Sequence, residues 1–314
     1  MERNIHKNYI HKKIFIIILL MLSIISFSDN LVIFHAGSLT NILNELKNNF
    51  EKIHPETNVR LVSSGSLVLV RKISELNQNA DLAFVADYSL IPKFLYPKYA
   101  KYNIIFSNNS IVLAYTDKSK YNDIITKDNW YNIIFKKGVI YSHSNPNLDP
   151  CGYRTLMTLQ LAEKYYNLNG LYNNFINSKN RMILKKSVDI IAYLEANEID
   201  YAFLYKSNAI QSNLKYIDLP NEINLSSNKF DEIYKNVFVE VPRDGEKTKI
   251  YGKAINYSFT ILENANNKKD AIEFIKFIYS ELGKKIFEDK FMNLFVDVDN
   301  PNNLPDELKN MWGY

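Results

Sequence analysis

Two short phrases combine residue types that could bind an anion. They are His35-Ala36-Gly37-Ser38-Leu39 and Ser63-Ser64-Gly65-Ser66-Leu67, so the Gly-Ser pair occurs twice, at Ser38 and at Ser66. Each phrase follows a β-type run and precedes a helix-like stretch, so each presents backbone N–H groups and a hydroxyl where the helix dipole favours negative charge. A serine N-cap without any ligand explains one such junction. Two junctions favour an oxyanion pocket, with plain helix capping as the alternative.

A third predicted strand-to-helix junction adds a carboxylate. Asp149 is followed by Pro150, which is typical of a helix N-cap with proline at the first helical position. A carboxylate beside a bound dianion repels it. Asp149 would therefore assist binding only if it bound the cation at the centre of the oxyanion. The two roles, helix cap and metal ligand, both stay open at this point.

The residues typical of catalysis do not form a recognisable pattern. After Ser28 the histidines are His35, His54 and His143, and the chain has no His-x-x-x-His pair, Gly-x-Ser-x-Gly turn, P-loop or Gly-x-Gly-x-x-Gly motif. The single cysteine, Cys151, excludes an intramolecular disulfide and a cysteine-based zinc cluster. We predict a protein that is not an enzyme, with a hydrolase or transferase on an α/β scaffold as the alternative of a different class.

The N-terminal segment 1–28 has the pattern of a cleavable signal peptide. A basic segment precedes the apolar run 14–25, and Ser26-Phe27-Ser28 offers small residues before a cleavage at Asp29. The apolar run is shorter than the ~20 residues that span a bilayer, and an uncleaved anchor is the alternative. Since no cysteine lies near the cleavage point, we expect a periplasmic or extracellular protein without a lipid anchor.

Net charge and chain length limit the class of protein further. The formal net charge of +4 includes +3 from the segment 1–28, so the mature chain carries about +1 and nothing in it favours nucleic acid. A length of 314 residues with 46% hydrophobic residues suits two globular domains.

Strand-like and helix-like segments alternate along the chain, which is typical of an α/β fold with a parallel sheet. Strands are predicted over 31–34, 59–62, 81–86, 104–115, 138–141, 182–184, 200–205 and 255–262; helices are predicted over 39–53, 67–76, 152–166, 188–196 and 269–279. Residues 142–150 are predicted as a polar loop. We expect lobe I at 29–110 plus 256–314, lobe II at 111–255, two crossings and a ligand cleft between the lobes.

Several longer phrases resemble a known family. FHAGSL, SSGSL, ADLAFVADYSLIP, NPNLDPCGYR, EIDYAFLYKSNAIQ and LKYIDLP look like the archaeal-type tungstate/molybdate-binding proteins of ABC transporters, from about Leu31 to Phe287. DPCGYR and DYAFLYKS are the specific parts. The resemblance implies a two-lobed class II periplasmic-binding fold, tungstate or molybdate as ligand, ABC permease subunits as partners, no cofactor and a monomer.

The resemblance also implies which residues contact the oxyanion. They are Gly37, Ser38, Ser66, Ala86, Asp149, Pro150, Cys151, Ser187 and Tyr205. In the family two carboxylates ligate the metal and raise it from four to six ligands. Asp149 matches the first, whereas Ser187 stands where the second is expected. Either Asp189 reaches in, or the metal has lower coordination and Ser187 donates a hydrogen bond.

Two arginines and other ions are the remaining candidates for anion binding. Arg71 and Arg154 are expected to be solvated or supporting residues, because a buried guanidinium discriminates poorly between dianions. Sulfate, which cannot expand its coordination, is expected to fit poorly. Another anion, or ferric iron held by some of the 22 tyrosines, is the alternative ligand.

Overall fold

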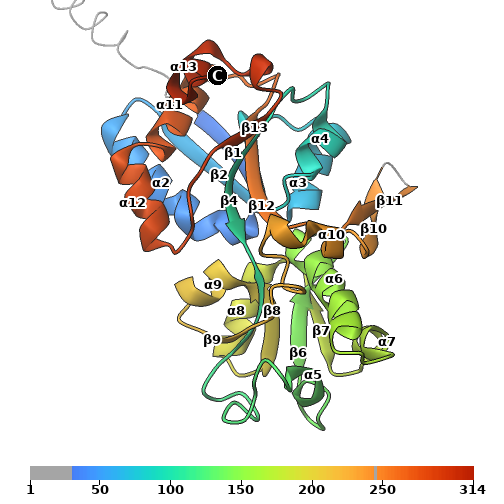
Figure 1. Ribbon diagram of the computed structural model, residues 1–314. Coiled ribbons are helices and arrows are strands. Elements are labelled where there is room, and N and C mark those ends of the chain that lie inside the picture. Colours follow the sequence, from blue (N-terminus) through green and yellow to red (C-terminus); the bar gives the residue numbers. More distant parts are fainter. Residues whose placement is uncertain (1–29, 244–245) are drawn as a thin grey trace, which may run out of the picture.

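The computed structural model describes residues 30–243 and 246–314. They form two lobes, each built on one β-sheet with helices packed against it (Figure 1). The predicted signal peptide, residues 1–28, lies outside the described residues. Within the described ranges, no helix has the length and apolar character needed to cross a membrane.

The sheet of lobe I has six strands in the order β13-β4-β12-β3-β1-β2. Its strands are β1 Asn30–Ala36, β2 Asn58–Ser64, β3 Leu82–Val85, β4 Asn103–Asn109, β12 Ile255–Ile261 and β13 Asp297–Asp299. β1 is parallel to β2 and β3, but β12 runs antiparallel to β3 and β4. The parallel arrangement predicted from the first three strands is confirmed, and β12 joins them antiparallel on its return from lobe II.

Most helices of lobe I bury one apolar side, whereas η3 buries no residue. They are η1 Gly37–Leu39, α2 Thr40–Ile53, α3 Ser66–Ser74, α4 Leu90–Leu95, α11 Lys268–Ile278, α12 Glu281–Asp289, η3 Pro301–Asn303 and α13 Asp306–Trp312. On α2, Phe50 packs edge-on against Phe274 and Phe277 of α11, with ring centroids 5.1 and 5.6 Å away. Burying such a ring contributes about 1.5–3 kcal/mol, which holds α2 against α11.

The sheet of lobe II has five strands in the order β7-β6-β8-β5-β9. Its strands are β5 Ile111–Tyr115, β6 Tyr141–Ser144, β7 Arg181–Leu184, β8 Tyr201–Tyr205 and β9 Lys215–Asp218. β6 is parallel to β7 and β8, so these three strands end at one edge of the sheet.

One long helix, α6, several shorter helices and one hairpin complete lobe II. They are α5 Trp130–Ile133, α6 Pro150–Tyr165, α7 Leu171–Asn177, α8 Ser187–Glu195, α9 Lys206–Gln211, η2 Asn228–Phe230, α10 Asp231–Tyr234 and the hairpin β10 Phe238–Arg243 with β11 Glu246–Tyr251. The sequence patterns did not predict α7, α9, β9 or the hairpin, nor α12, β13 and α13 in lobe I.

Two predicted boundaries are wrong for identifiable reasons. The predicted strand 104–115 is two strands, β4 and β5, and the chain passes from one sheet to the other at Ser110. The strand predicted at 138–141 begins only at Tyr141, because Gly138 has φ 79° and belongs to the preceding turn. Ser142, His143 and Ser144, expected in a polar loop, are buried members of β6.

The two crossings between the lobes are joined to one short segment. The N–H of Ile111, just after the outgoing crossing, donates to the carbonyl of Asn224 at 2.9 Å. The N–H of Ile255, at the start of the returning strand, donates to the carbonyl of Leu225 at 2.8 Å. Successive carbonyls of one segment therefore hold both crossings.

Candidate functional site

The register of lobe I places the two Gly-Ser pairs side by side. Ala36, the last residue of β1, lies opposite Ser64, the last residue of β2. The offset between register partners equals the spacing of Ser38 and Ser66, so both serines follow the same edge of the sheet. Neither is an N-cap, since Ala36 precedes η1, Gly65 precedes α3 and neither turn is capped by a side chain. Plain helix capping is therefore not the role of these serines.

Both serine hydroxyls are arranged to donate a hydrogen bond. The oxygen of Ser66 accepts the N–H of Ala86 at 2.9 Å, and the oxygen of Ser38 accepts the O–H of Tyr257 at 3.3 Å. Because each oxygen already accepts a hydrogen bond, its own hydrogen is left to donate. Ala86 thus contributes by orienting Ser66. Tyr257 was not predicted as a site residue, because it is one of 22 tyrosines and carries no motif of its own.

The carboxyl edge of lobe II supplies a second group of polar side chains. Asp149 follows β6, Ser187 follows β7 and Tyr205 ends β8. Asp149 is the N-cap of α6, and its Oδ1 accepts the N–H of Cys151 at 3.2 Å. Its Oδ2 accepts the N–H of Ser187 at 2.8 Å. One carboxylate therefore holds the N-termini of both α6 and α8.

Burial governs the ionisation of these groups. Burial raises the pKa of Asp149, against the N–H groups of Ser187 and Cys151 that favour its carboxylate. Burial also raises the pKa of Tyr205 well above its ordinary value, so its hydroxyl stays a donor. The nearby hydroxyl of Ser187 also lowers the pKa of Asp149, although the two side chains do not form a hydrogen bond.

Two of these hydroxyls are satisfied by nothing within the described ranges. The oxygens of Ser187 and Tyr205 are fully buried and have no hydrogen-bond partner there. Buried polar groups are almost always hydrogen-bonded, so both retain a donor that the described chain does not use. Asp189, the alternative second carboxylate, is exposed on α8 and does not reach inward.

The remaining predicted residues pack around this edge. Pro150 is the first residue of α6, and Cys151 is buried with its thiol directed to the carbonyl of Phe203 at 3.7 Å. Burial raises the pKa of Cys151 well above its ordinary value, which is unlike an activated nucleophile. Gly37 lies against α8, where an added Cβ would be 3.4 Å from Val188 Cγ2.

The two edges meet between the lobes. The ring of Tyr205 lies 5.7 Å from the ring of Tyr257. The amide nitrogen of Asn208, on α9, donates to the carbonyl of Ser38 at 3.1 Å. Gly65 approaches the loop before α6 so closely that an added Cβ would lie 2.0 Å from the carbonyl oxygen of Leu148. These contacts place the donors of lobe I and lobe II at one interface.

A hollow of about 310 Å³ opens beside this interface. It is lined by residues of η1, α2, α8 and α9, including Ser38, Val188 and Asn208. Another hollow, of about 740 Å³, lies in lobe I near α12 and α13 and shares no residue with the site. No group of three or more potential metal-ligating side chains of His, Cys, Asp or Glu occurs within residues 30–243 and 246–314.

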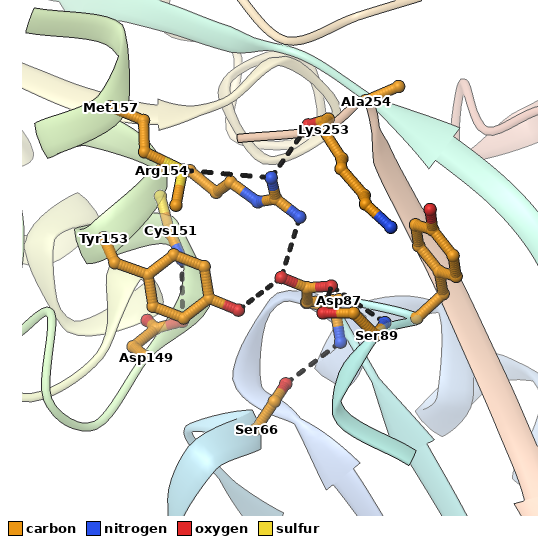
Figure 2. Close-up of polar contacts among 12 residues, drawn as sticks. Ser66, Asp87, Ser89, Asp149, Cys151, Tyr153, Arg154, Met157, Lys253 and Ala254 are labelled. Carbon is orange, nitrogen blue, oxygen red and sulfur yellow. Dashed lines mark hydrogen bonds and ion pairs between the residues drawn. The ribbon is translucent and has the colours of Figure 1, made fainter. Parts of the chain in front are cut away.

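A buried ion pair also joins the lobes (Figure 2). Arg154 of α6 donates to Asp87, which follows β3, at 2.7 Å, and the two side chains are 1% and 0% exposed. Tyr153 donates to the same carboxylate oxygen at 2.5 Å, and Arg154 also donates to the carbonyl of Lys253 at 2.8 Å. Burial opposes ionisation of Asp87, but Arg154 and donors from Tyr153 and Ser89 hold its pKa below the ordinary value.

The two arginines thus have different surroundings. Arg154 is buried and paired with Asp87, which fits the supporting alternative of that expectation and not the solvated one. Arg71 donates to Glu75 at 2.8 Å on the partly exposed side of α3. The charge of Arg154 is matched by Asp87 and is not left for an anion.

Comparison with known proteins agrees with this architecture. Residues 31–293 match the family described as bacterial extracellular solute-binding protein. The molybdate/tungstate-binding protein WtpA of Pyrococcus abyssi is 38% identical over 308 residues, covering 90% of this chain and 89% of the relative. An uncharacterized solute-binding protein of Petrotoga mobilis is 40% identical over 265 residues, covering 83% of each chain.

Solved structures show the same fold at low sequence identity. The periplasmic molybdate-binding protein of Azotobacter vinelandii superposes with a TM-score of 0.64 at 15% identity, covering 84% of this chain and 99% of that one. The sulfate-binding protein SubI of Mycobacterium tuberculosis gives 0.60 at 11% identity, covering 84% and 86%.

Fold and site together define a two-lobed solute-binding protein. The predicted two-lobed α/β fold is confirmed by these structures, and the resemblance to tungstate/molybdate-binding proteins by these relatives. The chain belongs to the bacterial extracellular solute-binding protein family.

Proposed function

We propose that this protein captures tungstate or molybdate between its lobes and delivers it to an ABC permease. The observation that carries the proposal is the pair of aligned serines, whose hydroxyls are both left to donate, opposite the unpaired hydroxyl of Tyr205. Relatives in Pyrococcus abyssi and Thermococcus kodakarensis, 38% and 36% identical, are named molybdate/tungstate-binding proteins.

Neutral donors suit a buried dianion. An anion removed from water needs hydrogen bonds from its surroundings, and serine hydroxyls, backbone N–H groups and Tyr205 supply them without a mobile counter-charge. The guanidinium of Arg154 lies at this interface, but Asp87 already pairs with it. Recognition therefore depends on donor geometry.

We propose the ranges 29–110 plus 256–314 and 111–255 as the lobes, and secretion by cleavage of residues 1–28. A binding role without catalysis completes the proposal.

Asp149 is proposed as a ligand of the metal at the centre of the oxyanion. A carboxylate offers about four lone-pair positions, and two of them accept the N–H groups of Cys151 and Ser187. The others remain for molybdenum or tungsten, which can exceed four ligands, whereas sulfur in sulfate cannot. Because Ser187 contributes a hydroxyl and no carboxylate, we propose coordination below six.

The mature protein, beginning at Asp29, is expected to prefer metal oxyanions over sulfate. Tungstate or molybdate should bind at least about a hundredfold more tightly, or about 2.7 kcal/mol, because only they gain the Asp149 ligand. Calorimetric titration with tungstate, molybdate, sulfate and phosphate measures this ratio. Equal affinity for sulfate and tungstate would leave only generic anion binding.

Asp149→Asn is expected to weaken tungstate binding at least roughly tenfold more than sulfate binding. Asparagine is an equally good N-cap in general, but here its NH₂ group would face the N–H of Ser187. That misfit affects both anions alike, whereas loss of a metal ligand affects tungstate alone. The two affinities of the variant, each relative to the parent, separate the two effects.

A matched control and a direct probe accompany this variant. Asp189→Asn removes an exposed carboxylate two residues beyond Ser187 and should change neither affinity. X-ray absorption at the molybdenum edge should report one ligand fewer in Asp149→Asn than in the parent. Equal losses of tungstate and sulfate affinity, with unchanged coordination, would reduce Asp149 to a helix cap.

A further inference from the structure

The amide of Asn109 has a fixed orientation. Asn109 ends β4, and its Oδ1 accepts the N–H of Ser110 at 2.9 Å and the N–H of Ser207 at 3.3 Å. Backbone N–H groups can only donate, so the oxygen must face them. The Nδ2 of Asn109 therefore faces the other way, toward the hydroxyls of Ser207 at 2.7 Å and Tyr257 at 3.1 Å.

This orientation determines the direction of the next hydrogen bonds. The oxygen of Tyr257 accepts from Asn109, so the hydrogen of Tyr257 is directed to Ser38 at 3.3 Å. Burial raises the pKa of Tyr257, which keeps the phenol protonated as a donor. Tyr257 is fully buried, so water does not compete for this hydrogen bond.

We infer that Asn109 and Tyr257 are positioning residues that fix Ser38 as a donor to the bound oxyanion. The inference rests on the proposed function and adds a selectivity device to it. The O–H of Tyr257 occupies one of the two acceptor positions of the Ser38 oxygen, so Ser38 presents its hydrogen to the ligand more readily than a lone pair. This arrangement favours an oxyanion with unprotonated oxygens over hydrogen phosphate, whose own O–H needs an acceptor.

The same relay spans the two lobes. Asn109 and Tyr257 belong to lobe I, whereas Ser207 lies on α9 of lobe II. Asn109 immediately precedes the crossing at Ser110. Movement of α9 away from β4 would remove both hydrogen bonds between Asn109 and Ser207 and leave the N–H of Ser110 to hold the amide. The orientation of Asn109, and through it that of Ser38, is therefore held most firmly when the lobes meet as they do here.

Tyr257→Phe tests the relay in a cycle with Ser38→Ala. Tyr257→Phe should weaken tungstate binding roughly three- to tenfold, as expected for loss of one hydrogen bond. In the Ser38→Ala background the same change should have less than about a twofold effect, because no hydroxyl remains to be oriented. Calorimetric titration of the four proteins measures the coupling.

A second readout separates orientation from packing. In Tyr257→Phe both acceptor positions of the Ser38 oxygen are open and its hydroxyl can turn to accept, so the ratio of tungstate to phosphate affinity at neutral pH should fall. Asn109→Asp should lower the ratio in the same way, because a carboxylate would draw the hydrogen of Tyr257 away from Ser38. Tyr141→Phe is the matched control: it removes a buried tyrosine hydroxyl that donates to the carbonyl of Phe175 at 3.0 Å in lobe II, and the ratio should not change.

The outcomes are distinguishable. Additive effects of Tyr257→Phe and Ser38→Ala, or an unchanged affinity ratio in both relay variants, would overturn the relay and leave the proposed function standing. Failure of the parent protein to bind tungstate and molybdate would overturn the proposed function and the relay together, and the parent titration alone reveals it.

Discussion

Gly65→Ala is expected to reduce tungstate affinity by at least roughly a hundredfold. The new Cβ would lie 2.0 Å from the carbonyl oxygen of Leu148 and 3.3 Å from Asp149 Cα. Both are backbone atoms of the other lobe, so no side-chain rotation relieves the overlap and the lobes must stay apart. The donors of lobe I and lobe II then cannot reach one ion together.

Binding and shape measurements together test this expectation. Titration gives the affinity, and small-angle scattering with tungstate should show a larger radius of gyration for Gly65→Ala than for the parent. Gly37→Ala is the matched control in the other Gly-Ser pair, because its nearest contact would be the side chain of Val188 at 3.4 Å. It should bind within a few-fold of the parent. Parent-like affinity of Gly65→Ala would show that the lobes adjust at little cost.

Arg154→Met is expected to weaken tungstate binding by about two to three orders of magnitude. It leaves Asp87 buried between the lobes without its cation, which typically costs about 3–5 kcal/mol. Water would reach Asp87 if the lobes separated. The loss of Arg154 therefore destabilises the arrangement in which the lobes meet, which is the one that holds the ligand. Asp87→Asn combined with Arg154→Met should recover most of the loss, because no charge is left buried. The amide oxygen can keep the hydrogen bonds from Ser89, and the hydroxyl of Tyr153 can turn to accept from the NH₂ group.

The pH dependence of this variant has a definite sign. In the parent, Arg154 helps to hold the pKa of Asp87 below its ordinary value, so Asp87 stays charged. The titration of Asp87 should therefore not make the affinity of the parent depend on pH. Without Arg154, burial between the lobes raises the pKa of Asp87, so Asp87 takes up a proton when the lobes meet. The variant should therefore bind more tightly as pH falls from neutral toward 5. Lys206→Met, which breaks a partly exposed pair with Asp218 inside lobe II, should change affinity little. An Arg154→Met protein that binds like the parent at every pH would contradict this role.

Ser38 and Ser66 could be predicted from sequence because each lies directly after a strand, within a short segment whose residue types determine its backbone geometry. Two strands, each followed by Gly-Ser, lie in register at an offset equal to their spacing in the chain. Asp149-Pro150 likewise indicated a helix start, and the structure confirms the cap. Such features depend on residues within one or two turns of each other, where backbone geometry follows from residue type.

The residues that join the lobes could not be predicted in the same way. Asp87 and Arg154 are far apart in sequence, and neither residue indicates that the other will neutralise it. Tyr257 becomes a positioning residue only because β12 returns antiparallel beside β4, which brings its hydroxyl to Asn109. His143 and its serine neighbours resembled a loop because polar residues are rarely fully buried.

The joined crossings limit how the lobes can move. Ile111 and Ile255 are hydrogen-bonded to adjacent carbonyls of one segment, at Asn224 and Leu225, so neither strand can rotate about its own axis without breaking a bond to that segment. Two crossings held side by side resist twisting of one lobe relative to the other more than they resist bending. We therefore expect the lobes to bend about these two crossings more readily than to twist around them. Bending would take one lobe's donors away from a bound ion together, so we expect the ion to lose them in one step.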